Sequence, residues 1–170
     1  LNTTRFLPFS PANVIIKETR DNIQKLTNTP QVTMIETNDY LILTLIDDIE
    51  NEILKSLNEK RKELKLPEFE KDMNMCKILT EIQRRALLSS EKLEIEIFNQ
   101  LSVNFHPNFF FTLNTEQNPG FHKLIFDKFW ERITKSDKLE IFKKCNTSLI
   151  SIFIYRNFIS AVIYIGKKIS

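Results

Sequence analysis

Residues 149–166, LISIFIYRNFISAVIYIG, form the most apolar stretch of the chain and are open to three interpretations: a membrane helix, a buried helix or two strands. A membrane helix needs about 20 mostly apolar residues, and a charge at its centre is costly in lipid. This stretch carries Arg156-Asn157 at its centre. β-Branched residues on both sides of a polar pair favour two strands joined by a two-residue turn, since asparagine tolerates a positive φ.

Such a turn fixes how the two strands face each other. With Arg156-Asn157 at the turn, Ile154 faces Ile159 and Ile150 faces Ile163, so one side of the hairpin is entirely aliphatic. The other side is aromatic with interspersed serines. We expect that side to be only partly covered or to contact a partner, through Phe153, Tyr155, Phe158 and Tyr164.

The composition argues against most enzyme classes. The 170 residues include only 2 Gly but 14 Phe. Few glycines leave little material for phosphate-binding loops or nucleophile elbows. Cys76 and Cys145 are too few for a disulfide scaffold or, unless joined by His106 and His122, for a zinc site, which favours free thiols in a reducing, intracellular compartment. No catalytic motif is present, so we expect a non-enzymatic protein without catalytic residues, metal or cofactor.

The first half of the chain reads as mainly helical. Ser10-Pro11 is a typical helix start, and we expect a helix over residues 11–26 and a short strand over 32–35. Asn38 then caps an expected amphipathic helix over residues 39–65, followed by another helix over 75–88. The apolar stripe of the amphipathic helix consists of Ile42, Leu45, Ile46, Ile49, Ile53 and Leu57.

The second half predicts an alternation of helices and strands. We expect a helix over residues 90–104, a strand over 108–113, helices over 119–133 and 136–145, and strands over 148–155 and 158–165. This is the order of a winged helix, in which the first strand pairs with a terminal hairpin that forms the wing. We therefore expect a mainly helical α+β protein, with a winged-helix-like domain over residues 73–170. Residues 1–72 are expected to form an N-terminal helical region, with a first winged helix of a tandem pair as the alternative.

The C-terminal part of the chain is basic. Residues 120–170 contain 10 Lys/Arg against 4 Asp/Glu. In a winged helix that reads duplex DNA, the second helix of the turn motif enters the major groove and the wing contacts phosphate. Lysines bind phosphate well but specify sequence poorly, so we expect weak, sequence-tolerant contact at most. An acidic protein partner and an ordinary solvated face are the alternatives. The expected contacts are Lys138, Lys143, Lys144, Asn146 and Arg156.

The helix expected over residues 119–133 is apolar on two sides. One stripe includes Phe121, Ile125 and Phe129, and the other includes Phe126 and Trp130. Such a helix either lies deep in a core or contacts a partner. In the second case, Phe126 and Trp130 would form the contact, with Trp130 as a hot spot.

The order of elements resembles the C-terminal tandem winged-helix region of the Stn-type subunit of the telomere-capping CST complex, and the composition, rich in Asn, Lys, Ile and Phe, looks like that of an AT-rich genome such as a ciliate's. The resemblance implies a nuclear interaction module for telomere maintenance. Such a module joins a single-stranded-DNA-binding assembly, and telomerase or a polymerase, through contacts with other protein subunits. No membrane association is expected. The alternative is a helical host-interaction or assembly protein, such as a viral one, without a nucleic-acid role.

Overall fold

The computed structural model of the chain describes residues 31–37, 40–46, 48–89, 92–116, 120–155 and 158–169, with the backbone alone for residues 31–37, 40–46, 48 and 155. The helix expected over residues 11–26 lies outside them. The fold is α+β. Its strands are β1 (Gln31–Thr37), β2 (Tyr40–Ile46), β3 (Glu70–Lys71), β4 (Phe105–Glu116), β5 (Thr147–Tyr155) and β6 (Phe158–Lys168). Its helices are α2 (Asp48–Glu63), α3 (Met73–Leu88), α4 (Leu93–Gln100), α5 (Phe121–Lys135) and α6 (Leu139–Lys144).

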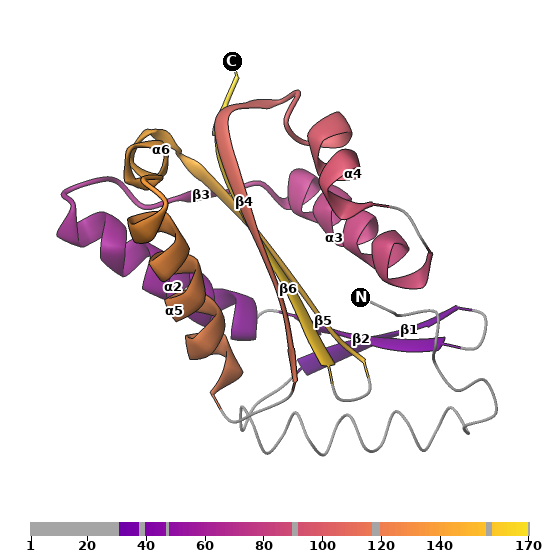
Figure 1. Ribbon diagram of the computed structural model, residues 1–170. Coiled ribbons are helices and arrows are strands. Elements are labelled where there is room, and N and C mark those ends of the chain that lie inside the picture. Colours follow the sequence, from indigo (N-terminus) through magenta and orange to yellow (C-terminus); the bar gives the residue numbers. More distant parts are fainter. Residues whose placement is uncertain are drawn as a thin grey trace.

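The strands form one sheet in the order β1-β2-β5-β6-β4, and the short β3 pairs in parallel with the start of β5 (Figure 1). β5 and β6 form the antiparallel hairpin expected from the sequence. Ile154 faces Ile159, and Ile150 faces Ile163, which confirms the predicted register. β4 pairs with β6, as the sequence order also predicted.

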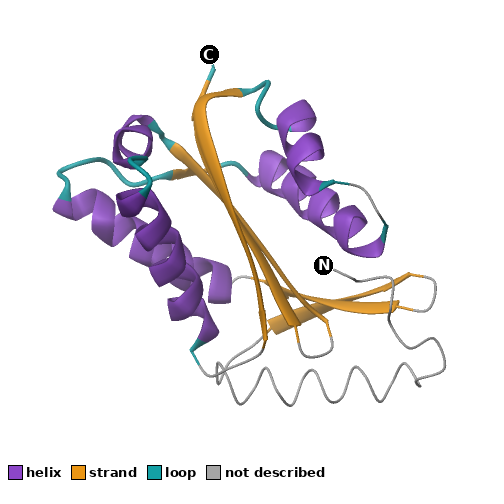
Figure 2. Cartoon of the chain, in the orientation of Figure 1, coloured by secondary structure: helices purple, strands orange, loops and turns teal. Residues whose placement is uncertain are grey.

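Helices cover both faces of this sheet (Figure 2). The aliphatic face packs against α2, α5 and α6 in a cluster that includes Ile53, Ile125 and Ile152. The opposite face packs against α3 and α4 in a second cluster that includes Leu79 and Tyr164. The expectation that this second face is only partly covered is therefore wrong. Apolar residues of α3 and α4 bury it, and alternation within the hairpin carries no information about helices elsewhere in the chain.

The amphipathic helix expected over residues 39–65 is correct only in its second part, since residues 40–46 form β2 and α2 begins at Asp48. The apolar positions Ile42, Leu45 and Ile46 fit a helical stripe, but they equally fit a buried strand. Pairing decides between the two, because β2 is antiparallel to β1 along its whole length and to β5 at Leu43 and Thr44.

The two sides of residue 72 share a hydrophobic core. Ile49, Ile53 and Leu57 of α2 lie in the same cluster as Ile125 of α5 and Ile152 of β5. From α4 onward the order of helices and strands agrees with the sequence prediction. α4 and α5, however, lie on opposite faces of the sheet, as their separate clusters require.

Candidate protein-interaction surface

β4 lies at one end of the strand order. Its residues 108–116 pair continuously with β6, and an irregularity between Phe105 and Asn108 precedes this stretch. In an antiparallel pair, every second residue directs its backbone N–H and C=O away from the neighbouring strand. Within the described residues, no strand pairs with the other side of β4. We call this side, over residues 108–115, the outer edge.

The outer edge has an unusual sequence for an exposed strand. Residues 108–115, NFFFTLNT, contain no charged side chain. Proteins commonly protect edge strands with charges, prolines or bulges, because an unpaired edge is a template for another strand. Here Pro107 and the irregularity lie only at its start. The remaining edge is therefore suited to pair with a further strand.

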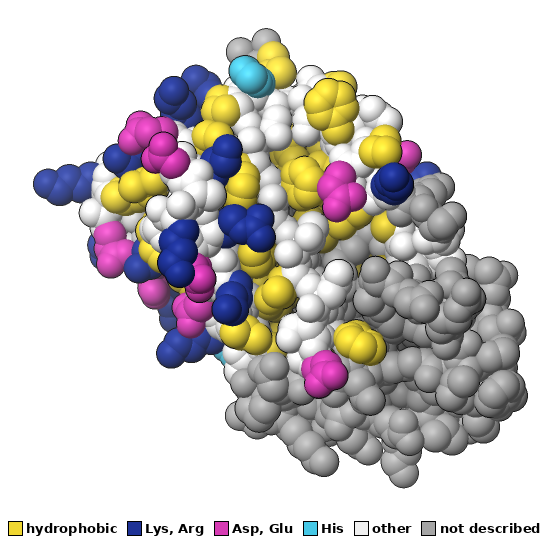
Figure 3. All heavy atoms as spheres, viewed as in Figure 1, with side chains coloured by type: hydrophobic (Ala, Val, Ile, Leu, Met, Phe, Trp, Pro, Cys, Tyr) yellow, Lys and Arg dark blue, Asp and Glu magenta, His cyan; other side chains and the backbone are white. Residues whose placement is uncertain are grey.

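On one face of the sheet, the outer edge borders a basic groove beside α5. The groove is lined by Phe111, Thr112, Leu113, Lys128, Glu131, Arg132 and Lys135. Lys135 donates a hydrogen bond of 3.1 Å to Glu131 Oε1, which holds the pKa of that carboxyl below its usual range. Three cations against one carboxylate leave the groove positive. Figure 3 shows Lys and Arg side chains along one side of a hydrophobic band that follows β4.

Arg132 is the cation of this groove that lies over β4. Its guanidinium carbon is 5.7 Å from the centroid of the Phe111 ring. It forms no ion pair within the described residues, whereas Lys135 pairs with Glu131 at 3.1 Å. The planar guanidinium is thus available to bind a carboxylate in a bidentate manner.

On the other face, the outer edge borders a glutamine pocket between β4 and the helices α3 and α4. This pocket is lined by Gln83, Ala86, Leu87, Ser89, Lys92, Leu93, Glu94, Thr112, Asn114 and Ser160. Gln83 is only 1% exposed. Its Nε2 donates hydrogen bonds of 3.0 Å to the Ser160 carbonyl and 3.1 Å to Ser160 Oγ. A carbonyl can only accept, so these bonds fix the orientation of the amide.

The fixed amide leaves one buried acceptor without a partner. Gln83 Oε1 has no hydrogen bond within the described residues. Leaving a buried polar atom unpaired costs about 1–3 kcal/mol. Because this atom has almost no accessible surface, a group that enters the glutamine pocket would instead meet polar side chains of the lining such as Thr112 and Asn114, which favour an uncharged hydrogen-bonding group.

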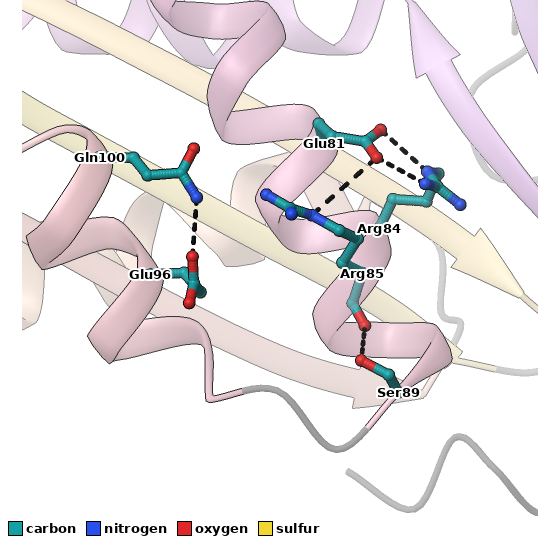
Figure 4. Close-up of polar contacts among 6 residues, drawn as sticks. All are labelled: Glu81, Arg84, Arg85, Ser89, Glu96 and Gln100. Carbon is teal, nitrogen blue, oxygen red and sulfur yellow. Dashed lines mark hydrogen bonds and ion pairs between the residues drawn. The ribbon is translucent and has the colours of Figure 1, made fainter.

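The glutamine pocket is lined by one cation and one carboxylate, Lys92 and Glu94, in contrast to the basic groove. Figure 4 shows Glu81 between Arg84 and Arg85 on α3, and Gln100 donating to Glu96 on α4. Arg84 Nε lies 2.9 Å from Glu81 Oε2, and this hydrogen bond lowers the pKa of Glu81. The two sides of the outer edge therefore differ in character: one is cationic and the other is polar without a marked charge.

The structure describes four of the five residues expected to contact nucleic acid, and these lie on or next to α6. Lys138 precedes α6, and Lys143 and Lys144 occupy its last turn, where Lys143 pairs with Glu140 at 3.4 Å. Asn146 has a structural role, because its Oδ1 accepts hydrogen bonds from Thr147 Oγ1 and from the Lys168 backbone. Arg156 lies outside the described residues.

Of the six residues expected to contact a partner, Phe126, Phe153 and Tyr164 are buried. Phe153 and Tyr164 are fully buried, so the expectation that they contact a partner is corrected. The rings of Phe126 and Trp130 are stacked, with their centroids 6.3 Å apart. The Trp130 ring also packs edge to face against Phe142 of α6, with the centroids 5.2 Å apart.

The two apolar stripes of α5 follow from its position. Lys60 Nζ of α2 lies 5.2 Å from the centroid of the Trp130 ring, while Ile125 and Phe129 pack toward the sheet. Phe126 and Trp130 thus occupy the space between α5 and its neighbours α2 and α6. Phe158 is 40% exposed, and the Tyr155 side chain is outside the described part of the chain.

A hollow near the start of α3 contains one of the two thiols. It is lined by Glu50, Asn51, Leu54, Lys71, Asp72, Met73, Cys76, Ser148 and Ile150. Cys76 Sγ donates to the Ile150 carbonyl at 3.3 Å, and burial raises the pKa of Cys76. Burial also raises the pKa of Cys145 to about 12. Both thiols are therefore protonated at neutral pH, and a protonated thiol is a poor nucleophile.

Metal-binding clusters and membrane-spanning helices are both absent from the described residues. Within these residues, no group of three or more His, Cys, Asp or Glu side chains is placed to hold a metal ion. Of the helices in the same part of the chain, none has the length and apolar character needed to cross a bilayer.

No protein-family model matches the chain, and no curated protein is significantly similar to it.

Sequence reasoning identified the strand at β4 but missed its importance. The run FFFTL predicted a strand, and the absence of charge over residues 108–115 was the available signal. The sequence did not show the position of β4 in the sheet. β4 becomes an edge because it pairs with β6 and nothing else among the described residues, and no local pattern states which strand will be last in a sheet.

Proposed function

We propose that this chain is a non-enzymatic protein-interaction module of a larger complex, and that it binds an extended segment of another subunit along the outer edge of β4. The observation that carries the proposal is the uncharged outer edge between the basic groove and the glutamine pocket. In strand addition, main-chain hydrogen bonds supply affinity, and alternate side chains supply specificity. A long edge with a distinct groove on each face supports both contributions.

The test is capture of the complex from the natural source with the full chain as bait. Asn114→Lys places a charge on β4 at an exposed position, a substitution that natural proteins use to prevent edge pairing. Asn99→Lys, on the exposed face of α4, is the matched control. We expect Asn114→Lys to lose partners that the parent and Asn99→Lys retain. Equal recovery by all three baits, or no partner with the parent, would contradict the proposal.

We also propose that the complex processes nucleic acid and acts in telomere maintenance in the nucleus. Support comes from the resemblance to the Stn-type subunit and from the winged-helix order of α4, β4, α5, α6, β5 and β6, with β4 beside β6. Two features limit direct reading of duplex DNA. α6 has only 6 residues, and α4 packs on the face of the sheet opposite α5.

Binding of the chain to fluorescent single-stranded and duplex DNA over a salt series tests this part of the proposal. Phosphate contact predicts an affinity that falls steeply with salt, with a slope that counts the contacts. Replacing both Lys143 and Lys144, in the last turn of α6, by Glu should weaken DNA binding, because two positive charges that could contact phosphate become negative. Absence of binding at low salt would instead favour the alternative, an assembly protein whose surface serves only protein contacts.

A further inference from the structure

We propose that the strand that adds to β4 is an acidic segment of a partner protein with a period-two pattern: carboxylates face the basic groove, and uncharged hydrogen-bond donors face the glutamine pocket. This inference rests on the proposed function, in which the outer edge of β4 accepts a strand.

Geometry places alternate side chains of the added strand on the two sides. A strand paired with β4 would lie about 4.8 Å beyond it, with successive side chains on opposite faces. The faces of β4 are already assigned by its pairing. Phe111 and Leu113 lie opposite Ile163 and Ala161 on the α5 side, and Thr112 and Asn114 lie opposite Val162 and Ser160 on the other side. Alternate side chains of the added strand therefore face the basic groove and the glutamine pocket.

Charge selects the side chains that face α5. Lys128, Arg132 and Lys135 are three cations in a groove with one carboxylate, Glu131. Lys128 and Arg132 are four residues apart on α5, a rise of about 6 Å. Side chains on one face of a strand repeat at about 6.7 Å. Two acidic residues separated by one residue would therefore match Lys128 and Arg132, with Arg132 able to bind its carboxylate through two N–H groups.

Thr112 and Asn114 select the side chains that face α3 and α4. Both lie on β4 and line the glutamine pocket. A strand paired with β4 would place its own side chains about 5 Å from theirs, at cross-strand distance. A Thr, Ser or Asn there can form a hydrogen bond with Thr112 or Asn114, whereas a branched apolar side chain of similar size would remove water from them without replacing its hydrogen bonds, which is unfavourable.

A second copy of this chain fits the site poorly. If two β4 strands paired, the residues brought to the basic groove would come from residues 108–115, which contain no carboxylate. The two basic grooves would also repel each other as they approached. The charge of the basic groove and the polar lining of the glutamine pocket together favour a different protein whose segment supplies both acid groups and hydrogen-bond donors.

The test uses labelled peptides as long as the regular part of β4, with the full chain as receptor. One peptide alternates Thr and Glu, the second has Gln in place of Glu, and the third has Val in place of Thr. Fluorescence anisotropy measures affinity, and amide chemical shifts of residues 108–116 report binding at β4. We expect the Thr/Glu peptide to bind about tenfold more tightly than either of the others, and its advantage over the Gln peptide to fall with salt.

Variants of α5 test whether the preference for Glu comes from Arg132 in the basic groove or from the overall positive charge of the helix. Arg132→Gln should remove most of the preference for Glu over Gln, whereas Lys123→Gln, exposed on α5 outside the basic groove, should retain it. Equal affinities of all three peptides, with shifts at β4, would overturn this inference and leave strand addition standing. No shift at β4 with any peptide would overturn the proposed function as well. Stronger binding of a short oligothymidine to the same residues would show that the basic groove serves nucleic acid instead.

Discussion

Arg61 of α2 donates a hydrogen bond of 2.7 Å from Nη1 to the backbone carbonyl of Phe142 in α6. Its Nε donates another, of 2.9 Å, to the carbonyl of Pro67, and its guanidinium carbon lies 4.3 Å from the centroid of the Phe69 ring. Arg61 is almost completely buried, and burial lowers its pKa. A single side chain thus holds α2, the segment that follows it and α6 in one arrangement.

Replacing Arg61 by Lys should destabilise the protein although the charge is kept. Lysine cannot form the same fork of hydrogen bonds or stack a planar group on Phe69. We expect the free energy of unfolding to fall by about 2 kcal/mol, measured by urea denaturation. Lys62→Ala, on the exposed neighbouring position, should change it by less than about 0.5 kcal/mol. If the two variants are equally stable, Arg61 does not join these elements.

Replacing Ile152 by Asp should prevent folding. Ile152 lies fully buried at the centre of β5, opposite Ala161, in the cluster formed with α2 and α5. A carboxylate there would lose its hydration without a partner, a cost of several kcal/mol. Ile152→Val, which keeps the apolar character, should cost only about 1 kcal/mol. Thermal melts followed by circular dichroism compare the three proteins. A folded Asp variant as stable as the parent would rule out the assigned register.

Replacing Gly166 by Ala should also destabilise the protein. An added Cβ at Gly166 would lie 2.7 Å from Phe105 Cβ, which is much too close for two carbon atoms. Phe105 is fully buried and packs edge to face on Tyr164 at 5.5 Å, so it has little room to move. We expect a loss of about 1–3 kcal/mol in urea denaturation. The adjacent exposed substitution Lys167→Ala should be nearly neutral, and an equally small effect at Gly166 would contradict the packing described.

Asp72 should make stability depend on pH in the acid range. Its carboxylate accepts a hydrogen bond from Lys168 Nζ at 2.6 Å and caps α3 through Met75 N, which lowers its pKa below the ordinary 3.8. Folding therefore favours the charged form. Its contribution is fully present above pH 3.8 and is lost as pH falls through the lower folded pKa.

The variants Asp72→Asn and Asp72→Ala separate the two roles of this carboxylate. Asparagine retains the cap but loses the ion pair, and because Lys168 is half-exposed we expect a cost of at most about 1 kcal/mol at pH 7. Alanine should cost about 1 kcal/mol more, since the cap is lost too. Urea denaturation from pH 7 to pH 2 should show the parent and Asp72→Asn converging at the acid end. A difference that stays constant over this range would exclude the ion pair as its cause.

The β5–β6 hairpin was predictable to the residue because its information is local. Arg156-Asn157 interrupts two alternating runs, and a two-residue turn at this pair places every isoleucine of the hairpin on the same side. The two apolar stripes of α5 could also be predicted from the sequence. The sequence left open whether the second stripe, with Phe126 and Trp130, faced a partner, because it does not show that α2 lies alongside α5.

By itself, the sequence determined the positions of α3, α5 and α6 to within a few residues, the hairpin with its register, and the α+β class, because helical and strand periodicities are properties of consecutive residues. Tertiary structure alone decided that residues 40–46 form a strand, that α3 and α4 bury the aromatic face of the hairpin, and that β4 ends the described strand order. Each of these depends on contacts between segments far apart in the chain. The candidate interaction surface belongs to this second group, since Gln83, Arg132 and the edge of β4 become neighbours only when the sheet forms between the two layers of helices.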